Sequence, residues 1–195
     1  IPTATAATYS AGVLAADTWY KRVVTSTLIG VASVKESNII KVTVNDFVPG
    51  SISADQTICE STIPAAFISV TPTGTGTVTY QWQNSLDGIS YSDITGATVE
   101  TYAASVLTAD TWYKRKVTST LNGTQCIKTT AAVKVTVNNL SPGTITGSQT
   151  ICEGVAPVAF TEIAATTDGV VTYQRQSSID GTSFTGIIPA ETNQG

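Results

Sequence analysis

Hydrophobic and polar residues alternate with a period of two along several stretches of this chain. Val78, Tyr80 and Trp82 occupy alternate positions, and Thr or Gln stands between them. The stretch 133–137 alternates valine with lysine and threonine in the same way. Because successive side chains of a strand point to opposite faces of a sheet, both stretches predict strands with one buried face.

The longest strand that we expect covers residues 111–120. In this stretch Tyr113 and Arg115 face one way, whereas Trp112 and Lys114 face the other. Turn signals separate such stretches, and Asn122-Gly123 is a candidate type I′ turn because both central residues of that turn need positive φ. About seven to nine short strands between turns predict an all-β domain of the β-sandwich type.

The chain also repeats itself at an offset of 93 residues. The segment that begins at Leu14 and reads Leu-Ala-Ala-Asp-Thr-Trp-Tyr-Lys-Arg returns at Leu107 with one difference, and Gln-Thr-Ile-Cys-Glu occurs at Gln56 and Gln149. Residues 1–102 align with 94–195 without a gap, and 51 of the 102 aligned positions are identical. We therefore expect tandem domains with a 93-residue period.

This period divides the chain into three segments. Residues 48–140 would form a complete repeat, residues 1–47 the C-terminal half of a repeat, and residues 141–195 the N-terminal half of another. The short link 138–143 contains Pro142, which predicts domains placed end to end with limited swing.

The two half repeats hold complementary sets of strands and would expose unpaired sheet edges if left alone. Two explanations remain open at this point. The sequence is a window on a longer polypeptide, or the tail half of one molecule completes the head half of the next in a filament.

Composition narrows the classes of function. The net charge of −4 and the pI near 4.6 argue against nucleic acid as a partner, and the absence of histidine removes the commonest acid/base group and metal ligand. We expect no cofactor and no enzymatic activity. No apolar run approaches the roughly 20 residues that a transmembrane helix needs, so we expect no transmembrane segment in this sequence.

Cys59 and Cys126 fall in one period, whereas Cys152 is the next copy of Cys59. We predict a Cys59–Cys126 disulfide, which would stabilise the fold by roughly 4 kcal/mol through loop closure. The equivalent of Cys126 in the first segment is Ser33, so that segment would lack the bridge. The alternative is three free buried thiols. A disulfide would imply an oxidising, extracellular setting.

Leu107 followed six residues later by Tyr113 resembles the tyrosine corner of fibronectin type III and immunoglobulin-like domains, and Trp82 resembles their core tryptophan. This resemblance implies a hydrogen bond from the Tyr113 hydroxyl to the backbone near Leu107. Arg115 stands where the second cysteine of an immunoglobulin domain would be, which departs from the immunoglobulin pattern.

A second resemblance covers the whole chain. Four motifs occur in order, namely Gln-Thr-Ile-Cys-Glu, Tyr-Gln-Trp-Gln-x-Ser-x-Asp-Gly, Ile-Thr-Gly-Ala-Thr and Thr-Trp-Tyr-Lys-Arg. Together they are similar to the Ig-like or PKD-like repeats of long secreted surface proteins of Bacteroidota. Those proteins resemble adhesins associated with gliding motility or type IX secretion and are generally not enzymes.

Arg115 and its copy Arg22 face inward on a strand, where a guanidinium must be paired or stacked. We expect the Arg115 stem to pack beneath Trp82 or a neighbouring aromatic residue with its head at the sheet edge, and a ligand-binding arginine is the alternative. In the third segment Arg175 replaces Trp82, which would place an arginine in a core position.

Trp112 and its copy Trp19 face outward, next to Lys114 and Lys21. Such a tryptophan could stack on a sugar ring, or pack against its own flanking loop or the adjacent domain, and we favour the packing.

Four aspartates at predicted turns or junctions raise the question of calcium: Asp46, Asp55, Asp87 and Asp93. Their spacing matches no calcium loop, and some are replaced in the other copies, so we expect turn chemistry instead and no metal.

These observations favour a structural or adhesive repeat segment of an extracellular cell-surface fibre or filament. Its partners would be neighbouring repeats or copies of itself, with surface glycans as further candidates. The alternative is an array of carbohydrate-binding modules.

Overall fold

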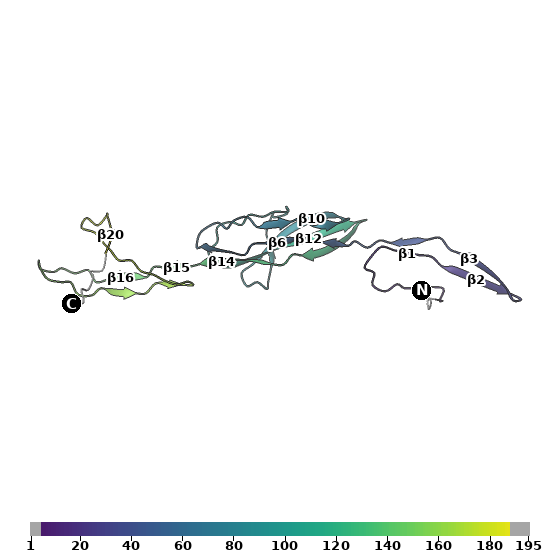
Figure 1. The fold of residues 1–195 in the computed structure, drawn as a ribbon, viewed down its shortest axis with the longest axis horizontal. Coiled ribbons are helices and arrows are strands. Elements are labelled where there is room, and N and C mark those ends of the chain that lie inside the picture. Colours follow the sequence, from purple (N-terminus) through teal and green to yellow (C-terminus); the bar gives the residue numbers. More distant parts are fainter. Residues whose placement is uncertain (1–4, 188–195) are drawn as a thin grey trace, which may run out of the picture.

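The computed structural model of the chain describes residues 5–187, in which all regular structure is β-strand. The fold is therefore all-β, as the alternating pattern predicts. In Figure 1 the strands lie along one long axis, with the segments before β5 and after β14 at opposite ends of the largest group of strands. Residues 1–4 and 188–195, which belong to the first and third predicted segments, lie outside the described residues.

The strands of the N-terminal segment are β1 (Thr18–Tyr20), β2 (Val23–Leu28), β3 (Val31–Glu36) and β4 (Ile40–Val42). Those of the central segment are β5 (Phe47–Val48), β6 (Ser51–Ser53), β7 (Gln56–Cys59), β8 (Ile68–Val70), β9 (Thr73–Gly74), β10 (Thr77–Ser85), β11 (Ser92–Asp93), β12 (Thr111–Leu121), β13 (Thr124–Thr129) and β14 (Val133–Asn138). The C-terminal segment contains β15 (Leu140–Ser141), β16 (Thr144–Thr146), β17 (Thr161–Ile163), β18 (Thr166–Thr167), β19 (Gln176–Ser177) and β20 (Thr185–Gly186).

The central segment is built on one sheet with the strand order β11-β10-β12-β14-β7, to which β13 adds beside β12. Its long ladder is antiparallel and joins β10 to β12, with Trp82 opposite Arg115. At the far edge β14 and β7 are parallel. Asn122 and Gly123 have φ values of 48° and 78° and turn β12 into β13, as expected for a type I′ turn.

Two short strand pairs, β6 with β8 and β5 with β9, accompany this sheet. Ile52 of β6 and Phe67, just before β8, pack in one core cluster with residues of the large sheet, among them Trp82, Tyr113 and Val135. The hydrophobic core therefore lies between two layers of strands, as in a β-sandwich.

The alternation predicted for β12 is present in the structure. Its residues from Thr111 to Ser119 are buried at every second position, and Tyr113 and Arg115 lie on the buried side. Trp82 is fully buried, stacks against Phe67 at 5.9 Å between ring centroids, and donates from Nε1 to the carbonyl of Val99 at 3.0 Å. The core role predicted for Trp82 is confirmed.

The outer segments keep the local strand pairing of the central one. Trp19 pairs with Lys41 between β1 and β4, just as Trp112 pairs with Lys134 between β12 and β14. The pairing of β16 with β17 likewise has the register of β6 with β8, shifted by 93 residues. Each outer segment is therefore one part of the arrangement that the central segment has in full.

Candidate functional site: the buried arginine, the outer face and the junctions

Arg115 joins the two layers of the central segment. It is fully buried, and its Nη1 donates to the Ser69 hydroxyl at 2.5 Å and to the carbonyl of Glu100 at 2.7 Å. Its Nη2 donates to the carbonyls of Val70 at 3.0 Å and Pro49 at 3.2 Å. Every acceptor is neutral, so the charge is held by oriented dipoles and not by a carboxylate.

Burial lowers the pKa of Arg115 from its ordinary value, and the guanidinium lies 5.0 Å from the ring centroid of Tyr80. Its Nε has no hydrogen-bond partner among residues 5–187. Our expectation of a head at the sheet edge was wrong, because the carbonyls of the opposite layer draw the head into the interior. An arginine with four internal partners is a structural clamp, and because it is fully buried it presents no group at the surface.

Among residues 5–187 the Tyr113 hydroxyl makes no hydrogen bond to the backbone near Leu107, so the tyrosine corner that the resemblance implies is absent there. The N–H of Leu107 donates to the carbonyl of Thr62 at 3.1 Å, and the carbonyl of Leu107 accepts from the N–H of Ser61 at 2.9 Å. The backbone of Leu107 is thus used by the neighbouring loop and not by Tyr113. Tyr113 is instead part of an aromatic cluster, 5.0 Å from Phe67 between ring centroids, and burial raises its pKa to about 12.

Trp112 is half-buried on the outer face of the sheet. Lys134 Nζ lies 4.8 Å from its ring centroid, and the indole also packs close to Gly88, where an added Cβ would come within 3.2 Å of it. Lys114 turns away and lies 3.8 Å from the ring centroid of Tyr91. Trp112 and Lys114 thus lie on the same, outer side of β12 but contact different residues. Trp112 packs against its flanking turn, which is the packing that we favoured.

In the N-terminal segment the corresponding tryptophan, Trp19, is exposed to solvent. Trp19 is 60% exposed, with Lys41 Nζ 4.9 Å from its ring centroid. Lys21 pairs with Glu36 at 2.8 Å instead of lying against the indole. Of the two predicted surface tryptophans, Trp19 is thus the more exposed to solvent.

Charged residues beside Trp112 pair with each other and with the backbone. Asp110 accepts from the N–H of Val137 at 2.7 Å and pairs with Lys134 at 2.6 Å, and these contacts lower its pKa. In the N-terminal segment Asp17 likewise accepts from the N–H of Val44 and forms an ion pair with Lys41. Alternation of hydrophobic and polar residues does not predict these contacts of Asp110. Its place in the repeated Ala-Asp-Thr-Trp-Tyr motif was a signal that could have indicated them.

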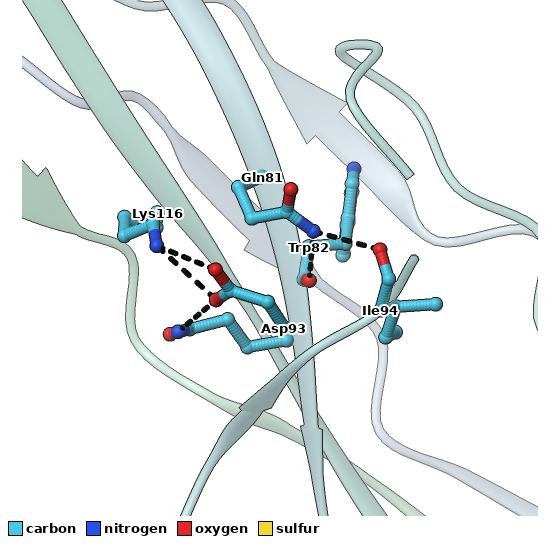
Figure 2. Close-up of polar contacts among 6 residues, drawn as sticks. Gln81, Trp82, Asp93, Ile94 and Lys116 are labelled. Carbon is cyan, nitrogen blue, oxygen red and sulfur yellow. Dashed lines mark hydrogen bonds and ion pairs between the residues drawn. The ribbon is translucent and has the colours of Figure 1, made fainter. Parts of the chain in front are cut away.

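Figure 2 shows a further set of contacts that fastens β11 and the loop after it to the sheet. Lys116 Nζ contacts both oxygens of Asp93, at 2.9 and 3.1 Å, and Gln81 Nε2 donates to the carbonyls of Trp82 and Ile94 at 2.9 and 2.8 Å. Because Lys116 compensates the Asp93 carboxylate, the pKa of Asp93 is lowered. These groups support the strands.

The turn chemistry predicted for Asp87 is confirmed. Its Oδ1 accepts from the N–H groups of Ile89 and Ser90, both at 2.8 Å, and from the Ser85 hydroxyl at 2.7 Å, which holds its pKa well below the usual range. Asp55 accepts from the N–H of Lys134 at 2.7 Å. Within residues 5–187 no group of three or more acidic, Cys or His side chains is arranged to hold a metal.

The junction between the N-terminal and central segments is tied by Asn45. Its Nδ2 donates to the carbonyls of Ser119 at 2.9 Å and Thr124 at 3.3 Å, and its Oδ1 accepts from the Ser119 hydroxyl at 2.9 Å. Lys128 reaches the Phe47 carbonyl and lies 3.8 Å from Asp46. Asn45, which lies in the link between the N-terminal and central segments, is thus bonded to the hairpin of β12 and β13.

The second junction has different partners. Asn139 Nδ2 donates to Asp168 at 3.1 Å, and Asn138 Oδ1 accepts from the Thr167 hydroxyl at 3.3 Å. An open depression lies beside these residues, lined by Glu60, Asn139, Leu140, Ser141, Thr166, Thr167 and Asp168. Asn138 is the copy of Asn45, but segment 141–187 contains no counterpart of β12 and β13 to bind it.

The predicted Cys59–Cys126 disulfide is wrong. All three cysteines are described, and each has a free thiol. Cys59 pairs with Asn138, beyond the Thr111 end of β12, whereas Cys126 pairs with Ser119 near the other end. Eight strand residues separate those ends by roughly 25 Å, and a disulfide needs Cα atoms within roughly 7 Å.

The expectation for Arg175 was also wrong. Its side chain is 59% exposed and pairs with Glu162, because segment 141–187 lacks the strands that bury Trp82 in the central segment.

Comparison with known proteins gives a family. The family model described as "Domain of unknown function (DUF8696)" matches residues 1–46, 48–139 and 141–195. No curated protein and no solved structure matches the chain. The described residues contain no helix of the length and apolarity that membrane crossing requires.

Proposed function

Since the chain belongs to the DUF8696 family, which matches it in three consecutive stretches, we propose that it is a structural or adhesive repeat segment of an extracellular cell-surface fibre or filament. In this role it acts as a stalk or as an assembly module. Its partners are neighbouring repeats and copies of itself. The resemblance to long secreted surface proteins, drawn from the repeated motifs, supports the extracellular setting.

The observation that carries this proposal is the junction at Asn45. One side chain makes three hydrogen bonds to the β12–β13 hairpin, and the next-but-one residue, Phe47, is buried in the central segment. On the other side, the N–H of Val44 is bonded to Asp17 at 2.8 Å. The link therefore has few free residues, which favours neighbouring units that hold a fixed direction.

The internal contacts agree with a structural role. The Arg115 guanidinium donates its hydrogen bonds to internal acceptors. The carboxylates of Asp110 and Asp93 form ion pairs with lysines of the same sheet. Arrays of such units act by length and stiffness, and contacts between neighbours supply part of their stability.

Asn45→Ala tests the proposal. The substitution removes the junction bonds while leaving the core of the central segment intact, so we expect a more flexible chain in small-angle X-ray scattering and faster proteolysis between residues 43 and 49. Asn38→Ala is the matched control, because the Asn38 side chain makes no hydrogen bond among the described residues. A stalk role is refuted if the unsubstituted chain is already as flexible as Asn45→Ala.

An array of carbohydrate-binding modules is the second candidate, and the exposed Trp19 favours it. An open indole with a lysine beside it can stack on the apolar face of a sugar ring. A glycan array separates the two functions. Binding that is lost in Trp19→Ala and retained in Trp112→Ala would support this candidate, and no binding above background would leave the structural role.

A further inference from the structure

The chain continues on both sides of the central segment. It enters this segment at β5 and leaves it after β14. In Figure 1 the neighbouring segments extend from opposite ends of the central group of strands, along one long axis. A pull along the chain is therefore applied to the strands that enter the central segment and to the strand that leaves it.

The entering strand of the large sheet, β7, and the leaving strand, β14, lie side by side and run in the same direction. They pair in parallel from Gln56 opposite Val135 to Cys59 opposite Asn138. A pull along the chain draws β7 back toward its first residue and draws β14 forward beyond its last residue. The two strands must then slide along each other. The evenly spaced hydrogen bonds between them are consequently loaded together and do not open one after another.

Contacts at both ends extend the pairing of β7 with β14. Before β7, the Asp55 carboxylate accepts from the N–H of Lys134 at 2.7 Å. After β7, the N–H of Glu60 donates to the carbonyl of Asn138 at 3.3 Å. The sliding strands are thus joined from residue 55 to residue 60.

The leaving strand is held on both of its sides. Apart from β7, it pairs with β12, where Val135 lies opposite Thr111. The N–H of Val137 also donates to the Asp110 carboxylate at 2.7 Å. Among the described strands, β7 pairs with β14 alone and lies at the edge of the sheet. The contact between β7 and β14 is therefore the part of the sheet that resists the pull.

We propose that the pairing of β7 with β14 is a shear clamp, which lets the central segment bear tension along the chain without unfolding. This inference rests on the proposed role as a stalk and adds that the stalk carries load. Both strand motifs occur twice in the sequence. Gln-Thr-Ile-Cys-Glu begins at Gln56 and Gln149, and Lys-Val-Thr-Val-Asn begins at Lys41 and Lys134. The residues of the clamp thus belong to the repeated motifs.

Force spectroscopy of the 195-residue chain, held by its two ends, is the first test. Unfolding of residues 47–138 should lengthen the chain by roughly 250–300 Å. The dependence of the unfolding force on the loading rate gives the distance to the transition state. For the clamp this distance should be about 3 Å, the length of one hydrogen bond. Strands that opened pair by pair would move by roughly 7 Å for each pair, because one residue of each strand is freed.

This measurement decides without any substitution. A distance to the transition state below about 7 Å supports the clamp, and a distance of about 7 Å or more overturns it.

A matched pair of proline variants tests which strands carry the load. N–H groups that face one neighbouring strand recur at every second residue, so Ile58, like Glu60, directs its N–H at β14. Ile94, beyond the opposite edge of the sheet, donates its N–H to the carbonyl of Trp82 at 2.8 Å. Both isoleucines are half-buried against the same core. Ile58→Pro and Ile94→Pro therefore each remove one backbone hydrogen bond at a comparable position.

Both proline variants should be less stable than the parent in urea, whereas the unfolding force should differ between them. Ile58→Pro should lower the force by roughly a third, because proline removes one of the few bonds that share the load. Ile94→Pro should leave the force close to that of the parent. Equal unfolding forces for the two variants overturn the clamp. Should Ile58→Pro not fold, the loading-rate measurement on the unsubstituted chain decides alone.

Failure of the clamp and failure of the stalk are distinguishable. A long distance to the transition state with a stiff Asn45 junction in solution would remove the clamp and leave the stalk. A short distance with a flexible junction would remove the stalk and leave the clamp.

Discussion

Replacing the buried arginine with an apolar residue of similar length is the sharpest perturbation of the fold. Arg115→Met removes four hydrogen bonds of 2.5–3.2 Å that join β12 to the opposite layer. The acceptors left behind are three part-buried backbone carbonyls and the Ser69 hydroxyl. The substitution therefore tests the claim that one residue holds the two layers together.

The magnitude follows from opposing contributions. Hydrogen bonds to a charged group contribute about 1.5–3 kcal/mol each, which gives a gross loss of about 6–12 kcal/mol for four. Removing a buried charge recovers several kcal/mol of desolvation. We expect a net loss of about 3–5 kcal/mol in the free energy of unfolding.

Urea unfolding followed by near-ultraviolet circular dichroism measures this loss, because Trp82, Tyr102 and Tyr113 form one aromatic cluster in the core. Lys116→Met is the matched control. Its ion pair with Asp93 is partly solvated, so its loss should cost below about 1 kcal/mol. An Arg115→Met protein within 1 kcal/mol of the parent would refute the clamp.

Three further predictions concern single groups. Burial raises the pKa of Tyr113 to about 12, so this tyrosine ionises at lower pH in the unfolded chain than in the folded one. The stability of the fold should therefore fall between pH 10 and 12. In Tyr113→Phe the melting temperature, measured over the same pH range, should fall less. The lowered pKa of Asp110 means that its stabilisation is present above its ordinary value of 3.8 and is lost as the pH falls below it. Asp110→Ala should therefore cost about 1–2 kcal/mol at pH 7 and less at pH 3, measured by urea unfolding at both pH values. Without reductant, a thiol reagent should titrate all three cysteines in the unfolded chain, and fewer would contradict the free thiols.

The sequence predicts the strands of the central segment well because their signal is local. The alternation in β12 and the Asn122-Gly123 turn depend only on which side of the sheet each residue faces and on backbone φ. Trp82 could be placed in the core for the same reason. These features do not depend on how distant strands are ordered in the sheet.

The candidate site could be predicted only in part, because contacts between strands depend on that order. Cys59 and Cys126 share a period, yet the parallel pairing of β7 with β14 puts Cys59 at the opposite end of the sheet from Cys126. The Arg115 partners are backbone carbonyls, which leave no trace in residue identity. Asn45 and Ser119 become a junction pair only when the β12–β13 hairpin lies beside the link.

The most direct test of the central claim is the shape of the chain in solution. Small-angle X-ray scattering should give the cross-section of a single sandwich and a skewed distance distribution with a long tail. A symmetric distribution from a compact particle would contradict a repeat segment that acts through length.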